Sequence, residues 1–151
     1  MPVFGQRLGL VMFLMVAAGI LLTGCGAEIA RASIQSVGEY ELTFMHDGYP
    51  VDLWTDLDIE YIDDTSIWYE IEIRQSGDKI ADVNCNPFDH DFRLMARRAE
   101  VRGVTKVSFL APMGCEVGVL PKGETQMDIT LFAEGGRVRI FRADLVVKEK
   151  E

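Results

Sequence analysis

The stretch Val51-Asp52-Leu53-Trp54-Thr55-Asp56-Leu57-Asp58-Ile59-Glu60-Tyr61 decides the fold. Its apolar residues fall on one parity: Val51, Leu53, Leu57, Ile59 and Tyr61. The even positions carry Trp54 and four acidic residues: Asp52, Asp56, Asp58 and Glu60. A helix would mix the two sets, whereas a strand sends them to opposite faces. The pattern therefore predicts a long β-strand with one buried face.

The same alternation resumes after the polar break at residues 63–66. Ile67, Tyr69, Ile71 and Ile73 alternate there with Trp68, Glu70, Glu72 and Arg74. We expect the two runs to form an antiparallel hairpin, with Ile59 opposite Tyr69 and Leu57 opposite Ile71, because this register keeps both apolar sets on one face.

Turn signals separate several further strand patterns. These patterns cover residues 39–44, 80–85, 104–111, 115–120, 127–133 and 137–147. Gly135-Gly136 suits a two-residue hairpin turn, which would place Leu131 opposite Ile140. The apolar parity then slips, and this slip predicts a β-bulge near Ile140-Phe141. Residues 86–103, with arginines at 93, 97, 98 and 102, are expected to be a crossover containing a turn or two of helix.

Short strands with frequent turns and no long helical period predict an all-β fold. We expect a single antiparallel β-sandwich over residues 38–148, immunoglobulin-like or transthyretin-like, with a small β-barrel as the alternative.

The N-terminus carries a different signal. Arg7 precedes an apolar run from Leu8 to Leu22, and Leu22-Thr23-Gly24-Cys25 follows with small residues before the cysteine. The run is shorter than the roughly 20 residues that a membrane-spanning helix needs. In wording and position, Leu22-Thr23-Gly24-Cys25 resembles the lipobox of bacterial lipoproteins.

The resemblance implies that residues 1–24 are a cleaved signal peptide and that Cys25 becomes a lipidated N-terminus. Residues 25–37 would then be the lipidated cysteine and a short tether, although residues 26–37 also suit a first edge strand. Gly26 stands where an Asp would imply retention at the inner membrane, so the outer membrane is favoured for this cell-envelope protein. An ordinary signal peptide with a chance cysteine, or an uncleaved anchor helix, is the alternative.

The net charge and the cysteines of the mature chain bear on its partners and on its covalent structure. Loss of the signal removes one basic residue and leaves 14 Lys and Arg against 24 Asp and Glu. Such a surface repels nucleic acid, so we expect no nucleic-acid partner. The two remaining cysteines, Cys85 and Cys115, are expected to form a structural disulfide in an oxidising compartment.

The predicted hairpin suggests a protein-binding surface. Trp54 and Trp68 would point outward among acidic side chains, namely Asp56, Asp58, Glu60, Glu70 and Glu72. Tryptophan is enriched at binding hot spots, and the carboxylates would attract a basic protein. A solvated outer face or a cation site are the other interpretations of this stripe.

Catalytic and metal-binding chemistry has weaker support. No nucleotide loop, nucleophile elbow or catalytic Cys-His pair is found, so no catalytic residue is assigned and we expect no enzyme. His46, His90 and Asp91 are the candidate metal ligands, if their loops meet. No cofactor is expected beyond the covalent lipid on Cys25, whose acyl chains would make the lipid bilayer a partner.

Together these features predict a membrane-anchored lipoprotein of the cell envelope that acts as a binding or accessory module. An inhibitor of an envelope hydrolase such as lysozyme is one alternative, because a negatively charged anchored domain suits a cationic enzyme. A metal-binding or enzymatic domain is the other.

The anchor can be tested by replacing Cys25→Ser in the expressed full-length chain. We expect the variant to incorporate no labelled palmitate and to leave the membrane fraction, because stable attachment needs two or more acyl chains. Palmitate labelling and fractionation measure this directly. Unchanged labelling of the serine variant would contradict the assignment.

Overall fold

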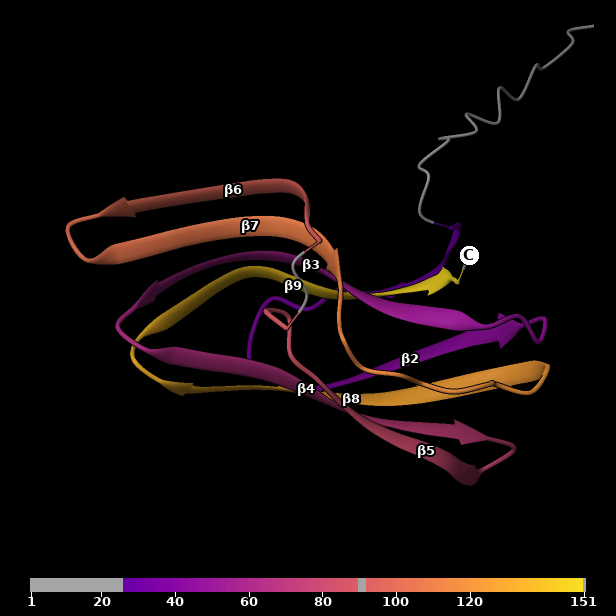
Figure 1. The fold of residues 1–151 in the computed structure, drawn as a ribbon. Helices are drawn as coiled ribbons and strands as arrows, with labels where there is room; N and C mark the ends of the chain where they lie inside the picture. The colour runs from indigo at the N-terminus through magenta and orange to yellow at the C-terminus, as the bar shows by residue number, and fades with distance from the viewer. Residues whose placement is uncertain (1–25, 90–91, 151) are drawn as a thin grey trace, which may run out of the picture.

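The chain folds into strands wherever apolar and polar residues alternate. The computed structural model describes residues 26–89 and 92–150, and these residues form nine strands (Figure 1). The strands are β1 (Glu28–Ala32), β2 (Gly38–His46), β3 (Val51–Ile62), β4 (Thr65–Gln75), β5 (Asp78–Cys85), β6 (Leu94–Val101), β7 (Val104–Pro112), β8 (Gly123–Gly135) and β9 (Val138–Glu149).

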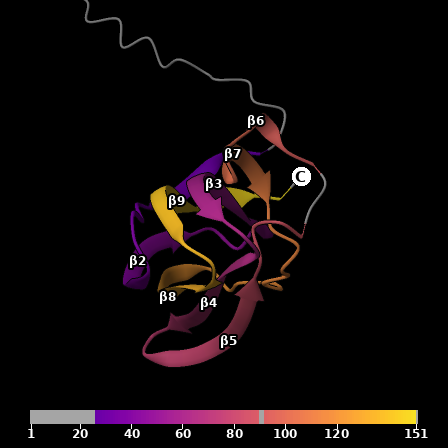
Figure 2. The same cartoon turned by 90° about the vertical axis from the view of Figure 1, so that its left-hand side faces the viewer.

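The strands build two antiparallel sheets. Sheet A has the order β1-β9-β3-β7-β6, and sheet B has the order β2-β8-β4-β5. Seen from the end, the two sheets form separate layers packed face to face (Figure 2). The predicted all-β sandwich is therefore confirmed.

The predicted buried faces are also confirmed. Leu53, Leu57 and Ile59 of β3 and Ile71 and Ile73 of β4 are each at most 2% exposed. The inward residues of β8 and β9 fill the same layer; they include Met127, Ile129, Leu131, Ala143, Leu145 and Val147.

The predicted pairing between residues 51–61 and 67–73 is wrong. β3 lies in sheet A between β7 and β9, whereas β4 lies in sheet B between β5 and β8. The apolar faces of β3 and β4 meet across the core rather than side by side. Alternation fixes the face that a strand buries, and two strands that bury the same parity satisfy it in one sheet or in two facing sheets.

The predicted C-terminal hairpin is wrong for the same reason. β8 pairs with β4 and β2, and β9 pairs with β3 and β1. Residues 51–75 and 123–149 thus form one long two-stranded ribbon that passes from sheet A into sheet B at a corner.

The Gly135-Gly136 dipeptide serves this corner instead of a tight hairpin turn. A Cβ atom at Gly136 would overlap the carbonyl oxygen of Ile62, and one at Gly135 would overlap that of Asp64. The two crossing segments are joined by backbone hydrogen bonds, 2.9 Å from Ile62 N to Arg137 O and 3.2 Å from Gly136 N to Asp64 O. Glycine is needed here because the two backbones approach so closely.

Two irregular regions differ in outcome. The bulge predicted near Ile140-Phe141 is confirmed, because Asp58 pairs with Arg142 while Ile59 pairs with Ile140. The helical turns predicted within residues 86–103 are wrong, because residues 94–101 form the edge strand β6. The strand predicted at residues 115–120 is also not observed.

The segment after Cys25 joins the sandwich almost at once. Of the two possibilities left open for residues 26–37, an edge strand is found at residues 28–32, where β1 pairs with β9. Ile34 is fully buried, and its carbonyl accepts a hydrogen bond of 2.8 Å from Ala143 N.

The predicted Cys85–Cys115 disulfide is present, with Cα atoms 5.1 Å apart. Cys85 ends β5 in sheet B, and Cys115 follows β7 of sheet A. The bond therefore links the two layers, and it closes a loop that contains the whole β6–β7 hairpin.

The hydroxyl of Tyr69 crosses the core between the layers. It lies 2.9 Å from Thr55 Oγ1 of β3 and donates a hydrogen bond of 2.8 Å to the carbonyl of Ala143 in β9. The side chain is fully buried, and burial raises the pKa of this hydroxyl above its ordinary value of 10.0.

Replacing Tyr69→Phe should lower the free energy of unfolding by about 1–3 kcal/mol, because buried Thr55 loses its partner. Stability of the wild-type protein should also fall as the pH rises above 10.0, since the unfolded tyrosine then ionises before the folded one. The variant should lack this contribution to the alkaline loss. Denaturant titrations at several pH values measure both effects.

The matched control is Tyr40→Phe, which removes a hydroxyl whose hydrogen bond to the Ser36 carbonyl is exposed. The loss in free energy of unfolding should be smaller for this variant, because the hydrogen bond that it removes is not buried. Equal losses for the two variants would contradict the role given to Tyr69.

Replacing both Cys85 and Cys115 with Ala should lower the free energy of unfolding by about 3–4 kcal/mol, because the unfolded chain is no longer constrained. Membrane attachment should persist, since it belongs to Cys25. Thermal unfolding and fractionation measure the two outcomes. Complete alkylation of both cysteines in the folded, exported protein would contradict the bond.

Candidate functional site

The surface predicted around two tryptophans is divided between opposite faces of the sandwich. Trp54, Asp56, Asp58 and Glu60 belong to β3 in sheet A, and Trp68, Glu70 and Glu72 belong to β4 in sheet B. The division follows from the separation of β3 and β4 into different layers. Each face therefore has to be considered alone.

On sheet A, basic residues from distant segments neutralise the acidic stripe. Arg31 Nη1 lies 2.9 Å from Asp56 Oδ2 and 3.1 Å from Asp144 Oδ2, and Arg142 Nε lies 2.9 Å from Asp56 Oδ1. The hydrogen bond from Arg31 also holds the pKa of Glu28 below its usual value. Asp56, Asp144 and Glu28 therefore belong to one network of compensated charges.

Trp54 is not available as a surface anchor. It is 5% exposed. The ring of Phe92 packs edge-on against it, with centroids 6.4 Å apart, and Lys148 Nζ lies 4.3 Å from its ring centroid. The segment leading into β6 covers the indole, so Trp54 forms a second packing layer outside sheet A.

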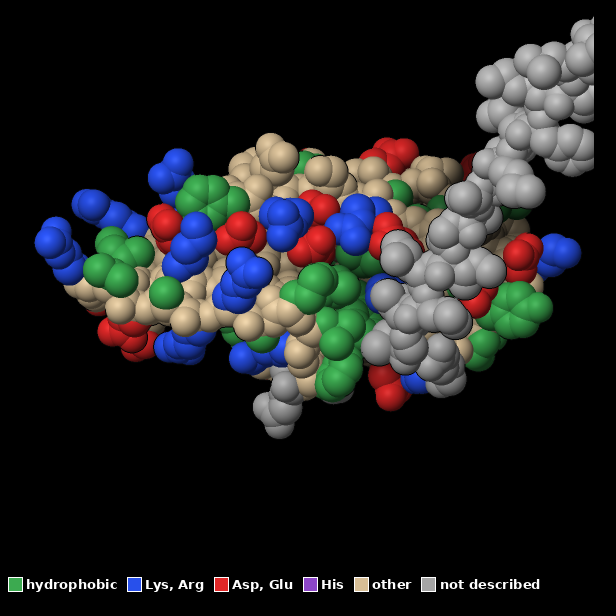
Figure 3. All heavy atoms as spheres, turned by 90° about the horizontal axis from the view of Figure 1, so that it is seen from above, with side chains coloured by type: hydrophobic (Ala, Val, Ile, Leu, Met, Phe, Trp, Pro, Cys, Tyr) green, Lys and Arg blue, Asp and Glu red, His purple; other side chains and the backbone are tan. Residues whose placement is uncertain are grey.

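A groove runs beside β6 on this face, with a volume of about 450 Å³. Asp58, Arg97, Ser108 and Arg142 contribute its polar lining. Asp58 Oδ1 is buried and has no hydrogen-bond partner among the residues that the structure describes. Basic side chains gather over this part of the molecule (Figure 3), and the groove therefore combines both signs of charge.

On sheet B, carboxylates form a transverse row across all four strands. Register pairs Glu41 of β2 with Asp128 of β8, Asp128 with Glu72 of β4, and Glu72 with Asp82 of β5. Like charges opposite one another destabilise a sheet, so the row costs stability that other packing must offset.

A neighbouring row adds further negative charge. Glu39 of β2 pairs with Thr130 of β8, which in turn pairs with Glu70 of β4. The side chains of Glu39, Glu41 and Glu70 are exposed, and no ion pair is found for them within residues 26–89 and 92–150. Exposed, uncompensated carboxylates leave this face strongly negative.

Two basic side chains offset part of the row. Arg74 forms ion pairs with Glu72 and, at 3.4 Å, with Asp128. Lys79 pairs with Asp82, and this hydrogen bond raises the pKa of the lysine. Three of the four carboxylates in the row, Asp128, Glu72 and Asp82, are therefore ion-paired. Glu41 and the neighbouring Glu39 and Glu70 have no such pair among the described residues and keep their charge.

An aromatic pair borders the acidic rows. Trp68 of β4 lies opposite Phe132 of β8, and their rings stack with centroids 5.2 Å apart and planes 13° apart. Trp68 Nε1 also lies 3.5 Å from Glu70 Oε1. Both rings are partly exposed, so this face retains the combination of tryptophan and carboxylates that the sequence predicted for one surface.

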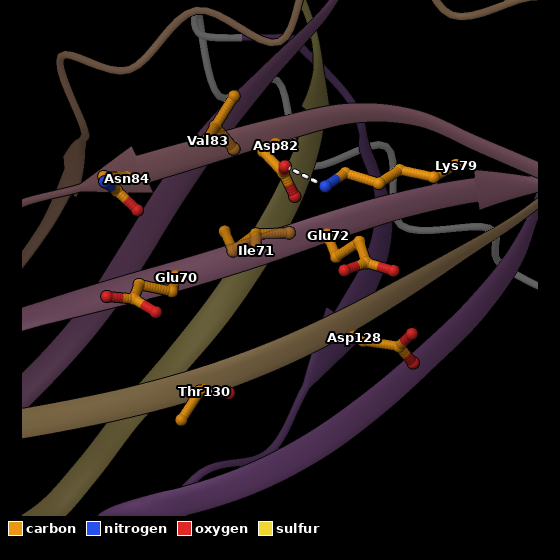
Figure 4. A pocket seen from close by; sticks show the side chains of 9 residues that line it. All are labelled: Glu70, Ile71, Glu72, Lys79, Asp82, Val83, Asn84, Asp128 and Thr130. Atoms are coloured by element: carbon orange, nitrogen blue, oxygen red, sulfur yellow. Dashed lines mark ion pairs between the residues drawn. The ribbon is translucent and has the colours of Figure 1, made fainter.

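The acidic rows surround a hollow of about 500 Å³. Figure 4 shows the carboxylates of Glu70, Glu72, Asp82 and Asp128 around it, with Lys79 turned toward Asp82. Its floor is the open outer surface of β4, β5 and β8. Such a surface suits contact with lysine and arginine side chains of another protein better than enclosure of a small ligand.

The metal-ligand candidates are not brought together. His46 is 2% exposed; its Nε2 donates to the Tyr49 carbonyl at 2.6 Å, and its Nδ1 accepts from Gly48 N at 3.2 Å. Both ring nitrogens are therefore engaged in hydrogen bonds within the β2–β3 turn. His90 and Asp91 lie outside the described residues. Among the residues that are described, no group of three His, Cys, Asp or Glu side chains could hold a metal ion.

Sequence reasoning missed four of the six carboxylates on this face. The missed residues are Glu39, Glu41, Asp82 and Asp128. Each lies at a polar position of an alternating strand pattern, and this position is the only sign in the sequence that its side chain points outward. Their convergence depends on the strand order of sheet B, and alternation does not specify that order.

Comparison with protein-family models and with curated proteins finds no match for this chain. Within the described ranges, no helix has the length and apolar character of a membrane span.

Proposed function

We propose that this chain is a membrane-anchored lipoprotein of the cell envelope whose domain binds a basic protein through the outer face of sheet B. The observation that carries the proposal is the acidic row Glu41–Asp128–Glu72–Asp82 together with the exposed carboxylates beside it. Glu39, Glu41 and Glu70 form no ion pair among the described residues. Like charges in adjacent strands destabilise the sheet. Attraction of a cationic partner would explain why the sheet carries them.

The two parts of the face would have different roles. The exposed carboxylates Glu39, Glu41 and Glu70 would raise the association rate by attracting the partner over a distance. The Trp68–Phe132 pair would supply apolar contact, as aromatic residues do at binding hot spots. Sheet A lacks this combination because Trp54 is buried beneath Phe92.

The lipid anchor supports a location in the envelope, with the outer membrane favoured by Gly26. The lipobox at residues 22–25 and the disulfide in the folded domain agree with export to an oxidising compartment. A binding or accessory role is preferred, because exposed carboxylates beside the Trp68–Phe132 pair suit recognition of a protein surface.

Inhibition of a cationic envelope hydrolase such as lysozyme is a more specific form of the same proposal. It uses the same face, since a cationic enzyme would meet the same carboxylates. An activity assay with a muramidase, run beside the binding assay, separates the two: binding without loss of activity supports the accessory role alone.

The binding face can be located by placing a photo-crosslinking amino acid at Thr130, in the middle of sheet B, or at Ser108, in the outer face of sheet A. Crosslinking in the native envelope should yield a basic protein from position 130 and not from position 108. Mass spectrometry identifies the adduct. An adduct formed only from position 108 would contradict the proposed face.

The role of charge can be measured with the double variant Glu41→Gln and Glu70→Gln. Association with the captured protein should slow by up to about tenfold, and its dependence on salt should weaken, because steering is lost. Stopped-flow or surface-based kinetics measure both.

The matched control is Asp63→Asn with Asp64→Asn, which removes the same formal charge from the exposed β3–β4 corner. This variant should associate at nearly the wild-type rate. Equal slowing by both pairs would mean that net charge, rather than the sheet B face, controls association.

A further inference from the structure

One end of the sandwich carries exposed apolar side chains beside the point where the described chain begins. Met45, Tyr49 and Val119 are 67%, 61% and 79% exposed. They come from the end of β2, from the β2–β3 turn and from the loop before β8. Large apolar side chains grouped at one end of a soluble domain indicate a contact surface.

Backbone hydrogen bonds place this group next to the N-terminal segment. Glu149 N donates to Ala27 O at 2.9 Å, and Lys150 N donates to Pro50 O at 2.8 Å. Tyr49 is therefore held near the strand end that also holds Ala27.

The same end includes the loop that carries Val119. His46 Nε2 donates to the Tyr49 carbonyl, and its Nδ1 lies 3.4 Å from the Pro121 carbonyl. A Cβ atom on Gly48 would lie 3.8 Å from the Cβ of Lys122. The β2–β3 turn and the 119–122 loop thus form one continuous surface, and hydrophobic side chains are visible at this right-hand end of the molecule in Figure 3.

The lipidated cysteine assumed in the proposed function would emerge from this end. Cys25 immediately precedes Gly26, and only Gly26 and Ala27 separate it from β1. The three Cα steps from residue 25 to residue 28 span at most about 11 Å, so the acyl chains would enter the bilayer close to Tyr49. The backbone of Gly26 lies close to the end of β9, because a Cβ atom there would overlap the Glu149 carbonyl oxygen.

We infer that this end of the domain, formed by Met45, Tyr49 and Val119, docks on the lipid bilayer beside the anchor. The inference rests on lipidation of Cys25. Tyrosine is favoured at membrane–water interfaces, because its ring is apolar and its hydroxyl is polar. The nearby charges are mixed, with Lys122 and Lys150 among Asp47, Glu124 and Glu149, so apolar insertion rather than attraction to anionic lipid drives the contact.

The experiment uses the full-length lipidated protein in phosphatidylcholine vesicles, with or without nitroxide-labelled lipid. A single cysteine is introduced by Tyr49→Cys, Val119→Cys or Val101→Cys and labelled with an environment-sensitive fluorophore while the Cys85–Cys115 disulfide remains oxidised. Val101 is the matched control, because it is 65% exposed in the strand that ends at the β6–β7 turn, far from residue 26 (Figure 1).

Nitroxide lipid should remove most of the fluorescence at positions 49 and 119 and leave position 101 unchanged. Replacing part of the lipid with phosphatidylglycerol should not alter this pattern. Flotation with the vesicles without quenching at 49 and 119, or equal quenching at all three sites, would overturn the docking alone. Failure to float would instead contradict the lipid anchor, on which the docking depends.

Discussion

The Tyr69 hydroxyl is the polar connection on which the arrangement of the two layers depends. It reaches from the centre of sheet B to Thr55 and to the Ala143 carbonyl in the centre of sheet A. Apolar packing alone is not directional, whereas this pair of hydrogen bonds fixes which residues of the two sheets face each other. These hydrogen bonds join the two arms of the ribbon formed by residues 51–75 and 123–149 across the core.

The sequence pattern predicts which face each strand buries, but it does not predict which strands lie side by side. The inward parity of β3, β4 and β8, the bulge in β9 and the disulfide follow from local composition. Pairing does not, because β3 and β4 bury the same parity and satisfy it equally well across the core or side by side. The Gly135-Gly136 dipeptide has the composition of a tight turn, and only the opposing Ile62 carbonyl reveals that it accommodates a crossing backbone.

The candidate site shows the same limit at the level of charge. Asp56 and Glu70 look alike in sequence, each on the polar parity of a strand rich in carboxylates. Arg31 and Arg142 reach Asp56 from segments far away in the chain, while Glu70 keeps its charge exposed. Trp54 and Trp68 differ for a similar reason, since Phe92 covers only the first. Whether a carboxylate is ion-paired and whether a tryptophan ring is covered depend on tertiary structure.

The position of the last two strands affects when the chain can fold. β8 lies between β2 and β4, and β9 lies between β1 and β3, so each sheet is incomplete at its centre until the C-terminal residues exist. Contacts between such distant segments form late. A chain emerging from the ribosome would stay unfolded until residues 123–149 were made. This delay would keep it competent to pass through a translocation channel, if the signal in residues 1–24 directs it there.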